Sequence, residues 1–320
     1  MSAYPPASRE NLIGFPANGP LILDVTLRDG GYVNKHSWTL AEAVSIVRAV
    51  DAARVPYVEV GYLGAANGGR LAPSSRCEPD YLGALRAEVA HTRLAVMVRP
   101  PQVSPERIVD LREHGVEMLR IVVPGGDVTG VRHYFEAARE AGLAVVANLT
   151  HISRVRPEEL AERARLCAEA GAELVYLADS NGSLYPSDVK ERVEKTAAGC
   201  PVPLGFHPHN NLGLAFINSC VAVDAGVSAV DASIGGIGKG GGNLPLELVV
   251  GHYVRQAGAD YRVEPLLQER STYSARLRML SDGTSHSLVA GLLDVSLDQA
   301  GALEEQAALN GYDAVLRSGI

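Results

Sequence analysis

The sequence predicts an α/β fold, a (β/α)8 TIM barrel with a helical C-terminal extension. Eight short apolar runs rich in Val, Ile and Leu alternate along the chain with segments of helical periodicity. Alternating strands and helices are typical of a parallel sheet covered by helices. The length of 320 residues fits one barrel of about 250 residues with an appendage.

The predicted strands are near-continuous apolar runs, as expected for strands buried on both faces of a parallel sheet. We expect them at residues 21–27, 57–63, 94–98, 118–123, 144–149, 174–178, 202–206 and 229–234. Eight such strands favour a closed barrel over the alternative, an open doubly wound sheet. The first strand is not followed by Gly-x-Gly-x-x-Gly, which argues against a dinucleotide-binding sheet.

Apolar residues at helical spacing predict the helices between these strands. We expect them at residues 40–53, 105–114, 132–141, 157–170, 186–198, 212–225 and 244–256. From about residue 260 the strand pattern ends, and helices are expected at 270–280 and 297–309. The chain is therefore divided into an N-terminal arm (1–19), a catalytic barrel (20–258) and a helical C-terminal extension (259–320).

Composition narrows the classes of partner. The sequence has 37 acidic and 29 basic residues, a net charge of −8, which opposes nucleic-acid binding. It shows neither a secretory leader nor an apolar stretch of about 18 residues, so no membrane partner is expected. The four cysteines have no Cys-x-x-Cys spacing, which excludes a zinc finger and a disulfide scaffold. We expect a cytoplasmic homo-oligomer with a small-molecule substrate.

Two histidines follow the seventh predicted strand, in the segment Gly205-Phe206-His207-Pro208-His209. Because side chains alternate along an extended chain, His207 and His209 point to the same side. Two imidazoles on one side can converge on one metal ion. Packed, hydrogen-bonded strands also contain His-x-His pairs, so a metal site requires a further ligand.

The first predicted strand ends in Arg28 and Asp29, before two glycines. Functional groups of a TIM barrel lie at the carboxyl ends of its strands, so Asp29 is expected at the same mouth as the histidines. One oxygen and two nitrogen ligands suit a catalytic Mn, Mg, Co or Zn ion. Arg28 can stabilise negative charge on an enolate oxygen. The alternative is an Arg-Asp pair that only holds the loop.

Three further strand ends carry polar residues. Glu59 and Asp179 can orient a metal ligand or Arg28 from behind, or instead cap a helix or form an ion pair inside the barrel. The glycine-rich loop of residues 235–243 brings backbone amides close to an anion or a metal site. Asn243, which ends this loop, can offer its carbonyl oxygen to the metal or cap the next helix.

Three motifs in this order resemble the barrel metallolyase superfamily, which includes 4-hydroxy-2-oxovalerate aldolase, 3-hydroxy-3-methylglutaryl-CoA lyase and 2-isopropylmalate synthase. The motifs are Thr26-Leu27-Arg28-Asp29-Gly30, His207-Pro208-His209-Asn210-Asn211 and Gly242-Asn243. Residues 178–186 are also similar to the end of strand six in that family. The resemblance covers residues 20 to 255.

The resemblance implies a divalent metal on Asp29, His207 and His209, with Asn243 near or on it, and Arg28 polarising the substrate carbonyl. The implied enzyme is an aldolase that makes or cleaves a carbon-carbon bond through the enolate of a pyruvate-type 2-oxo acid, with an aldehyde as second substrate. A Gly-Tyr pair after Arg-Asp-Gly favours this aldolase branch. The alternatives are an acyl-CoA-dependent Claisen-type synthase and a metal-binding barrel without catalysis.

Tyr32 takes the position at which the hydroxy-oxovalerate aldolases carry a base histidine. A phenol is a weak base at neutral pH unless neighbouring positive charge activates it. Proton transfer is therefore expected from an activated Tyr32, from His36 reaching into the site, or from a metal-bound water. The alternative for Tyr32 is packing over the loop.

Overall fold

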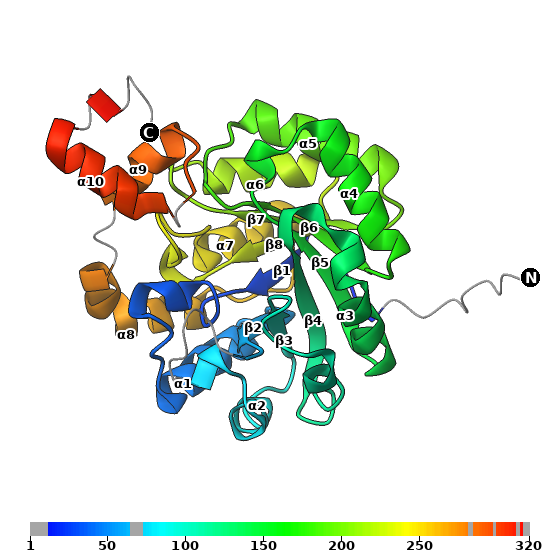
Figure 1. The fold of residues 1–320 in the computed structure, drawn as a ribbon. Coiled ribbons are helices and arrows are strands. Elements are labelled where there is room, and N and C mark those ends of the chain that lie inside the picture. Colours follow the sequence, from blue (N-terminus) through cyan, green and yellow to red (C-terminus); the bar gives the residue numbers. More distant parts are fainter. Residues whose placement is uncertain (1–11, 65–72, 281–283, 297–298, 312–313, 316–320) are drawn as a thin grey trace, which may run out of the picture.

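The computed structural model describes residues 12–64, 73–280, 284–296, 299–311 and 314–315, so most of the predicted N-terminal arm lies outside it. Its centre is a closed barrel of parallel strands in chain order (Figure 1). The strands are β1 (Leu21–Asp24), β2 (Tyr57–Tyr62), β3 (Arg93–Val98), β4 (Val116–Val123), β5 (Ala144–Leu149), β6 (Leu174–Asp179), β7 (Leu204–Pro208) and β8 (Ala229–Ala232). The predicted (β/α)8 barrel is confirmed.

The helices cover the outside of the barrel and continue into the C-terminal extension. They are α1 (Leu40–Ala52), α2 (Pro79–Arg86), α3 (Val128–Glu140), α4 (Pro157–Glu169), α5 (Pro186–Gly199), α6 (Ala215–Asp224), α7 (Leu246–Ala257), α8 (Glu264–Leu280), α9 (Thr284–Leu292) and α10 (Ala300–Asn310). Of these, α2 and α9 were not predicted. Within the described chain, no helix is both long and apolar enough to span a membrane.

The predicted helix at residues 105–114 is wrong. That segment forms a 3-10 helix at Pro105–Ile108 and then a series of turns up to Gly115. The amide of Leu111 bonds to the carbonyl of Ile108, three residues back, at 3.2 Å. Only part of the segment buries apolar side chains, since Val109 is 58% exposed, so packing gives little support to a full α-helix.

Two strand ends differ from the prediction in a way that shapes the site. β1 ends at Asp24 because its carboxylate accepts hydrogen bonds from the Thr26 amide (3.1 Å) and hydroxyl (2.5 Å), which turns the chain. β7 lies two residues later than expected, so His207 belongs to the strand itself. His209 follows it and forms an isolated antiparallel bridge with Asn243.

The barrel interior changes from apolar to polar along its axis. At one end its filling consists of Leu21, Leu23, Tyr57, Met118, Leu174, Tyr176 and other buried apolar side chains. Side chains two residues further along a strand also point inward. Glu59, Arg120 and Asp231 therefore form a charged layer above the apolar one, and all three are at most 1% exposed.

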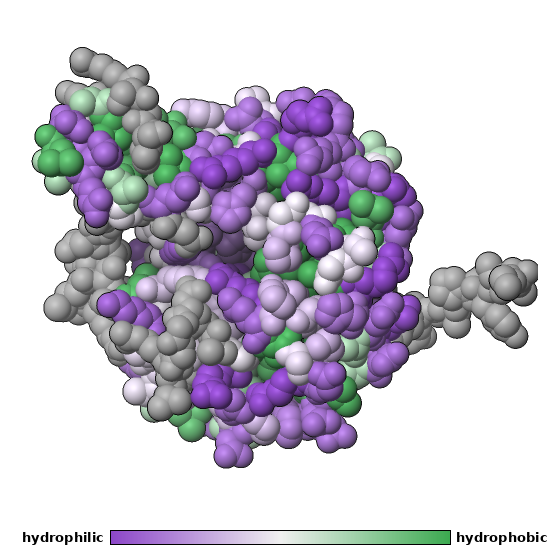
Figure 2. All heavy atoms as spheres, viewed as in Figure 1, coloured by the Kyte–Doolittle hydropathy of each residue, from purple (hydrophilic) through white to green (hydrophobic). Residues whose placement is uncertain are grey.

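The C-terminal extension rests on the mouth of the barrel. The Asp294 carboxylate, which follows α9, accepts hydrogen bonds from Ser153 (2.7 Å), Ser183 (2.8 Å) and Asn181 (2.6 Å) on the loops after β5 and β6. α9 and α10 pack on each other through a small apolar cluster that includes Leu303. Hydrophilic side chains dominate the face shown in Figure 2, and apolar ones gather around α9 and α10.

Candidate active site

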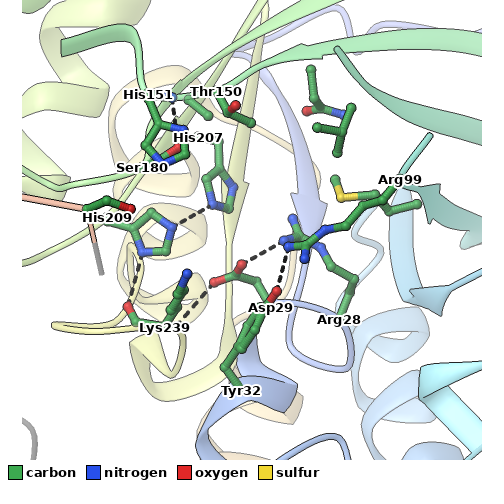
Figure 3. Close-up of a pocket in the computed structure, with 15 residues that line it drawn as sticks. Arg28, Asp29, Tyr32, Arg99, Thr150, His151, Ser180, His207, His209 and Lys239 are labelled. Atoms are coloured by element: carbon green, nitrogen blue, oxygen red, sulfur yellow. Dashed lines mark hydrogen bonds and ion pairs between the residues drawn. The ribbon is translucent and has the colours of Figure 1, made fainter. Parts of the chain in front are cut away.

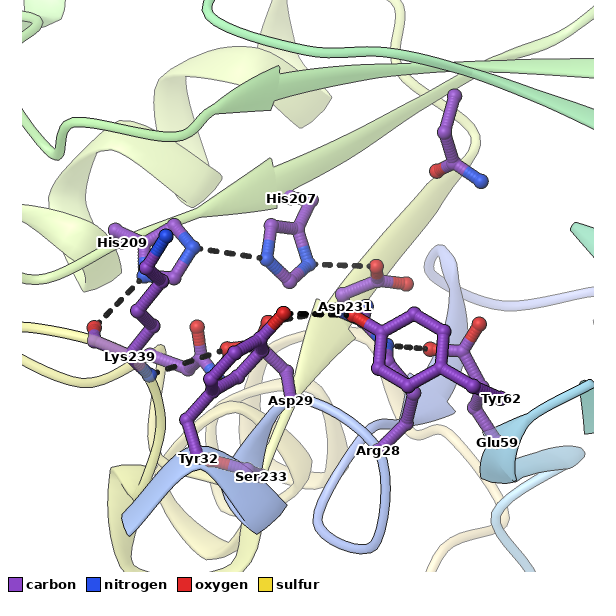
Figure 4. Close-up of polar contacts among 12 residues, drawn as sticks. Arg28, Asp29, Tyr32, Glu59, Tyr62, His207, His209, Asp231, Ser233 and Lys239 are labelled. Atoms are coloured by element: carbon purple, nitrogen blue, oxygen red, sulfur yellow. Dashed lines mark hydrogen bonds and ion pairs between the residues drawn. The ribbon is translucent and has the colours of Figure 1, made fainter. Parts of the chain in front are cut away.

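Asp29, His207 and His209 meet at the mouth of the barrel. One potential ligand atom from each residue lies within 4.8 Å of the others. The two Nε2 atoms are 3.3 Å apart (Figure 4). All three side chains are buried. The structure thus brings together the carboxylate and two imidazoles that the sequence predicted as metal ligands.

The hydrogen bonds of the two imidazoles show that this group fits a cation. His209 Nδ1 donates to the Lys239 carbonyl oxygen at 3.2 Å, because a carbonyl only accepts. His207 Nδ1 lies 2.7 Å from the Asp231 carboxylate and donates to it. With both protons on Nδ1, the two Nε2 lone pairs face each other, and a cation between them removes their repulsion. Burial lowers the pKa of His209 to about 4, so its imidazole is neutral.

Asp29 is held as a carboxylate. Burial raises its pKa, but the Arg28 guanidinium and the imidazoles of His209 and His207 outweigh burial and hold the pKa far below its usual range. Arg28 Nη1 donates to Asp29 Oδ1 at 2.6 Å, and Asn243 Nδ2 donates to Oδ2 at 2.9 Å. An ionised carboxylate fits a divalent cation.

Asn243 presents its amide nitrogen to the site. Besides Asp29, Nδ2 contacts the Ile237 carbonyl at 3.0 Å. The side-chain oxygen Oδ1 of Asn243 is buried and has no hydrogen-bond partner among the described residues. The glycine-rich loop makes this approach possible. A Cβ atom on Gly238 would lie 2.3 Å from Asn243 Nδ2 and 2.9 Å from Asp29 Oδ2. In this arrangement Asn243 positions Asp29.

A chain of buried charges connects Arg28 to His207. Arg28 Nε donates to Glu59 at 2.5 Å, and Glu59 also accepts from Arg120 at 3.1 Å. Arg120 in turn donates to Asp231 at 2.5 Å, the same carboxylate that accepts from His207. Each charge has an opposite partner, as buried ions require. Arg28 and one imidazole of the cluster are therefore oriented by one continuous network.

Sequence analysis missed Arg120 and Asp231. Both lie inside strands, whereas functional groups were expected only at strand ends. The available signal was a charged residue within an apolar run, at Arg120 in residues 118–123 and at Asp231 in residues 229–234. Met118 precedes Arg120 by two residues and Ala229 precedes Asp231 by two, and both are in the barrel filling.

Replacing Arg120 by methionine should destabilise the fold. The change leaves Glu59 and Asp231 as two buried carboxylates without their shared cation, at a cost of about 3–5 kcal/mol in the free energy of unfolding. Urea unfolding followed by circular dichroism measures this loss. Arg112→Met, at an exposed position, is the matched control, and equal stability of both variants would contradict the prediction.

Asp179 contacts backbone rather than Arg28 or the imidazoles. Its carboxylate accepts from the amides of Ser183 and Leu184, both at 3.2 Å. Burial raises its pKa to about 6. These bonds shape the loop after β6, which also contacts the C-terminal extension through Ser183. These amides belong to the loop before α5, whose N-cap residue is Tyr185, so Asp179 holds the loop and does not cap the helix.

Tyr32 and His36 lie at different depths relative to the cavity. The Tyr32 hydroxyl lies at the cavity, where Arg99 Nη2 donates to it at 2.5 Å, and it is 3.1 Å from the Tyr62 hydroxyl. The His36 ring packs edge-on against Tyr32, with ring centroids 4.9 Å apart, and a Cβ on Gly31 would lie 2.4 Å from its Nδ1. Burial lowers the pKa of His36 to about 4. His36 therefore lies behind Tyr32, not over the ligands.

The cavity above these groups has a volume of about 200 Å³ and is open to solvent (Figure 3). It is lined by Arg28, Asp29, Tyr32, Met97, Arg99, Val122, Asn148, Thr150, His151, Ala178, Ser180, His207, His209, Lys239 and Ser296. Its open side gives a small molecule access to Arg28 and the clustered side chains. Sequence analysis missed Arg99, although it directly follows a predicted strand, and it did not assign a role to Lys239.

A TIM barrel that gathers a carboxylate, two imidazoles and an arginine at the carboxyl ends of its strands has the architecture of a metal-dependent enzyme. Comparison with known proteins gives the family. The HMGL-like family model matches residues 20–272, and the chain belongs to this family.

Curated relatives indicate the branch. A 4-hydroxy-2-oxovalerate aldolase of Geobacillus genomosp. 3 is 33% identical over 266 residues, 79% of either chain. One from Thermus thermophilus is 36% identical over 237 residues, 73% of this chain and 68% of its own. An oxaloacetate decarboxylase of Mycobacterium tuberculosis is 33% identical over 234 residues, which are 72% of this chain and 69% of the relative.

Solved structures share the fold. The N-terminal domain of a proposed aldolase from Bacteroides vulgatus superposes with a TM-score of 0.80 at 25% identity, covering 93% of this chain and 99% of that domain. The carboxyl transferase domain of Rhizobium etli pyruvate carboxylase, with pyruvate, gives a TM-score of 0.73 at 19% identity. The match covers 92% of this chain and 54% of that one. Family and relatives confirm the predicted metal-dependent carbon-carbon lyase and favour the aldolase branch over the acyl-CoA-dependent synthase.

Proposed function

We propose that this protein is a divalent-metal-dependent aldolase acting through the enolate of a pyruvate-type 2-oxo acid, with an aldehyde as second substrate in the cytoplasm. The observation that carries the proposal is the position of Arg28. Its guanidinium lies beside the Asp29, His207 and His209 group and faces the same cavity. The curated aldolases among the relatives support the same chemistry.

We propose that Asp29, His207 and His209 hold the metal and that Asn243 and Asp231 position these ligands. One carboxylate and two imidazoles suit Mn²⁺, Co²⁺ or Zn²⁺, and the carboxylate also admits Mg²⁺. When bound, the divalent cation would supply Lewis-acid polarisation of the 2-oxo group. Asp231 accepts the Nδ1 proton of His207, which leaves Nε2 available as a ligand.

Arg28 is proposed to stabilise the negative oxygen of the enolate. Glu59 and Asp29 fix its guanidinium through two charge-assisted hydrogen bonds of 2.5 and 2.6 Å, so no reorganisation is needed as charge develops. In the synthetic direction the methyl group of pyruvate loses a proton, its carbon bonds to the aldehyde carbon, and the aldehyde oxygen gains a proton. Cleavage reverses these three changes.

We propose that Tyr32 exchanges the proton with the aldehyde or alcohol oxygen. Its hydroxyl faces the cavity and accepts a hydrogen bond from Arg99 at 2.5 Å. His36 packs behind Tyr32 and does not contribute to the described cavity lining. Among the protein groups considered, Tyr32 therefore has the best position.

A second candidate reaction is decarboxylation of oxaloacetate. It yields the same pyruvate enolate but breaks a bond to a carboxylate, so there is no hydroxyl to deprotonate. A phenol at position 32 favours this candidate, because departure of CO₂ leaves the electron pair on the enolate and requires no base. The relative from Mycobacterium tuberculosis that is named oxaloacetate decarboxylase supports it.

Tyr32→Phe separates the two reactions. Loss of a general acid-base group should slow aldol cleavage by about 100-fold or more, while decarboxylation should decrease much less. Both rates are measured by coupling pyruvate release to lactate dehydrogenase. A Tyr185→Phe variant, at an exposed position on the protein, is the control. Equal losses in both reactions would mean that Tyr32 only shapes the cavity.

The proposed function is tested by incubating the Mn²⁺-loaded protein with pyruvate in deuterated water. Loss of the methyl proton signal in the NMR spectrum shows enolate formation, and added aldehydes should give aldol products. A parallel assay with acetyl-CoA and 2-oxo acids records free-thiol release. Thiol release without methyl exchange would replace the aldolase by the synthase, and no turnover in either assay would favour a non-catalytic barrel.

A further inference from the structure

A second tyrosine contacts Tyr32 from outside the cavity. Tyr62 ends β2, is 2% exposed and does not contribute to the described cavity lining. The hydroxyl oxygens of Tyr62 and Tyr32 are 3.1 Å apart, and a dashed line joins them in Figure 4. Arg99 Nη2 donates to both oxygens, to Tyr32 at 2.5 Å and to Tyr62 at 2.9 Å. A buried hydroxyl therefore contacts the group proposed to transfer the proton.

The burial of Tyr62 decides the direction of the hydrogen bond between the two hydroxyls. A buried hydroxyl group requires an acceptor for its proton. Among the described residues, the acceptor that the Tyr62 hydroxyl reaches is the Tyr32 oxygen. The neighbouring His36 ring does not serve, because neither of its nitrogens has a hydrogen-bond partner in the described part of the chain. Tyr62 therefore donates this bond and Tyr32 accepts it.

This direction determines where the Tyr32 proton points. An uncharged hydroxyl oxygen donates one hydrogen bond and accepts at most two. On Tyr32 both acceptor positions are used, one by Arg99 and one by Tyr62. The proton of Tyr32 therefore points away from these two donors, toward the cavity that Tyr32 lines. Burial also raises the pKa of Tyr62, so Tyr62 keeps its own proton at neutral pH.

The aromatic rings hold the two hydroxyls in place. His36 packs edge-on against both rings, with its centroid 4.9 Å from that of Tyr32 and 5.6 Å from that of Tyr62. Arg99 Cζ lies 4.7 Å and Arg28 Cζ 5.9 Å from the centre of the Tyr62 ring. These contacts involve the ring of Tyr62 and not its hydroxyl, so a phenylalanine would keep them. Tyr62→Phe therefore tests the hydroxyl separately from the packing.

We propose that Tyr62 is a positioning residue, which donates a hydrogen bond to the Tyr32 oxygen and directs the Tyr32 proton to the aldehyde oxygen. This inference rests on the proposed aldolase function. In the synthetic direction the Tyr32 proton passes to the aldehyde oxygen, and the hydrogen bonds from Tyr62 and Arg99 stabilise the negative charge left on Tyr32. In cleavage the alcohol proton returns to the Tyr32 oxygen. Tyr62 keeps its own proton in both directions.

The test is a double-mutant cycle on the cleavage of 4-hydroxy-2-oxovalerate by the Mn²⁺-loaded protein, followed by pyruvate release. Tyr62→Phe should lower kcat about tenfold at nearly constant KM, because the Tyr32 oxygen loses one of its two donors. In the Tyr32→Phe variant no oxygen remains to be oriented, so adding Tyr62→Phe should have no further effect. Pyruvate methyl exchange, which involves no aldehyde, should keep its rate in Tyr62→Phe.

Tyr81→Phe is the matched control, because the buried Tyr81 hydroxyl donates to the Val60 carbonyl on β2 at 2.9 Å. It should keep the cleavage rate although it also loses a buried hydrogen bond. An unchanged cleavage rate in Tyr62→Phe would overturn the positioning role. So would a loss that is equally large in the Tyr32→Phe background or in methyl exchange, since both indicate a general structural effect. If the unmodified protein shows neither methyl exchange nor cleavage, the proposed function itself is overturned.

Discussion

Asp29→Ala and His207→Ala are expected to lose the bound metal while keeping the barrel. Each change removes one of the three proposed ligand atoms, which lie within 4.8 Å of one another. Removing an outer partner of a metal ligand typically costs 10- to 100-fold in affinity, so loss of a ligand itself should cost more than about 100-fold. Elemental analysis after gel filtration measures the metal content, and pyruvate methyl exchange should decrease in parallel.

The two variants also have different consequences for the protein. Asp29→Ala leaves Arg28 with Glu59 as its carboxylate partner among the described residues, whereas His207→Ala leaves Asp231 paired with Arg120. Circular dichroism should show the barrel intact in both, because each remaining ion is still paired. His91→Ala, at an exposed position, is the control. Full metal content in both Asp29→Ala and His207→Ala would show that the ligands are wrongly assigned.

Binding of the metal is also expected to contribute to stability. A ligand that binds only the folded state raises the free energy of unfolding by an amount that depends on its concentration relative to Kd. The two imidazoles, whose Nε2 atoms are 3.3 Å apart, have facing lone pairs that a cation would bridge. Stripping the metal with a chelator should therefore lower Tm in the unmodified protein and have a much smaller effect in His207→Ala.

The architecture was predictable because the barrel strands are buried on both faces. That burial leaves a signal of apolar runs, and all eight runs correspond to strands. The ends of the strands were harder to predict, since local side-chain bonds decide them. Asp24 binding to Thr26 ends β1 three residues early. The prediction of a helix at residues 105–114 was wrong for a related reason. The apolar spacing did not show that amides such as that of Leu111 bond to carbonyls three residues back.

The candidate ligands were predictable because barrel topology brings the carboxyl ends of distant strands together. Asp29 and His207 are far apart in the sequence, yet both follow from that one rule. The network behind them needed a different kind of information. The partners of Arg120 on β2, β5 and β8 depend on strand tilt and stagger, and a single sequence contains no measure of either. For the same reason the sequence could not decide whether Tyr32 or His36 reaches the cavity. Their relative depth depends on how the 3-10 helix Gly30–Asn34 packs.

Arg28→Lys is expected to reduce catalysis strongly while leaving the metal in place. Lysine keeps the positive charge that holds Asp29 ionised, so the three ligands should still bind the cation. It lacks the guanidinium fork that contacts Glu59 and Asp29 at 2.5 and 2.6 Å and points the remaining donors into the cavity. Losing an oriented donor to a developing oxyanion typically costs about 100- to 1,000-fold in kcat.

The distinguishing measurement for Arg28→Lys is the combination of metal content and pyruvate methyl exchange. If Arg28 stabilises the enolate oxygen, exchange should slow by about 100-fold or more at unchanged metal content, because the enolate forms before any aldehyde enters. If Arg28 only holds the loop through Asp29, the one alternative that the sequence left open, metal content and exchange should decrease together. Arg48→Lys on α1 should change neither. Exchange at the unmodified rate in Arg28→Lys would contradict the role proposed for this arginine, because a lysine ammonium cannot reproduce the two-pronged contact with Glu59 and Asp29.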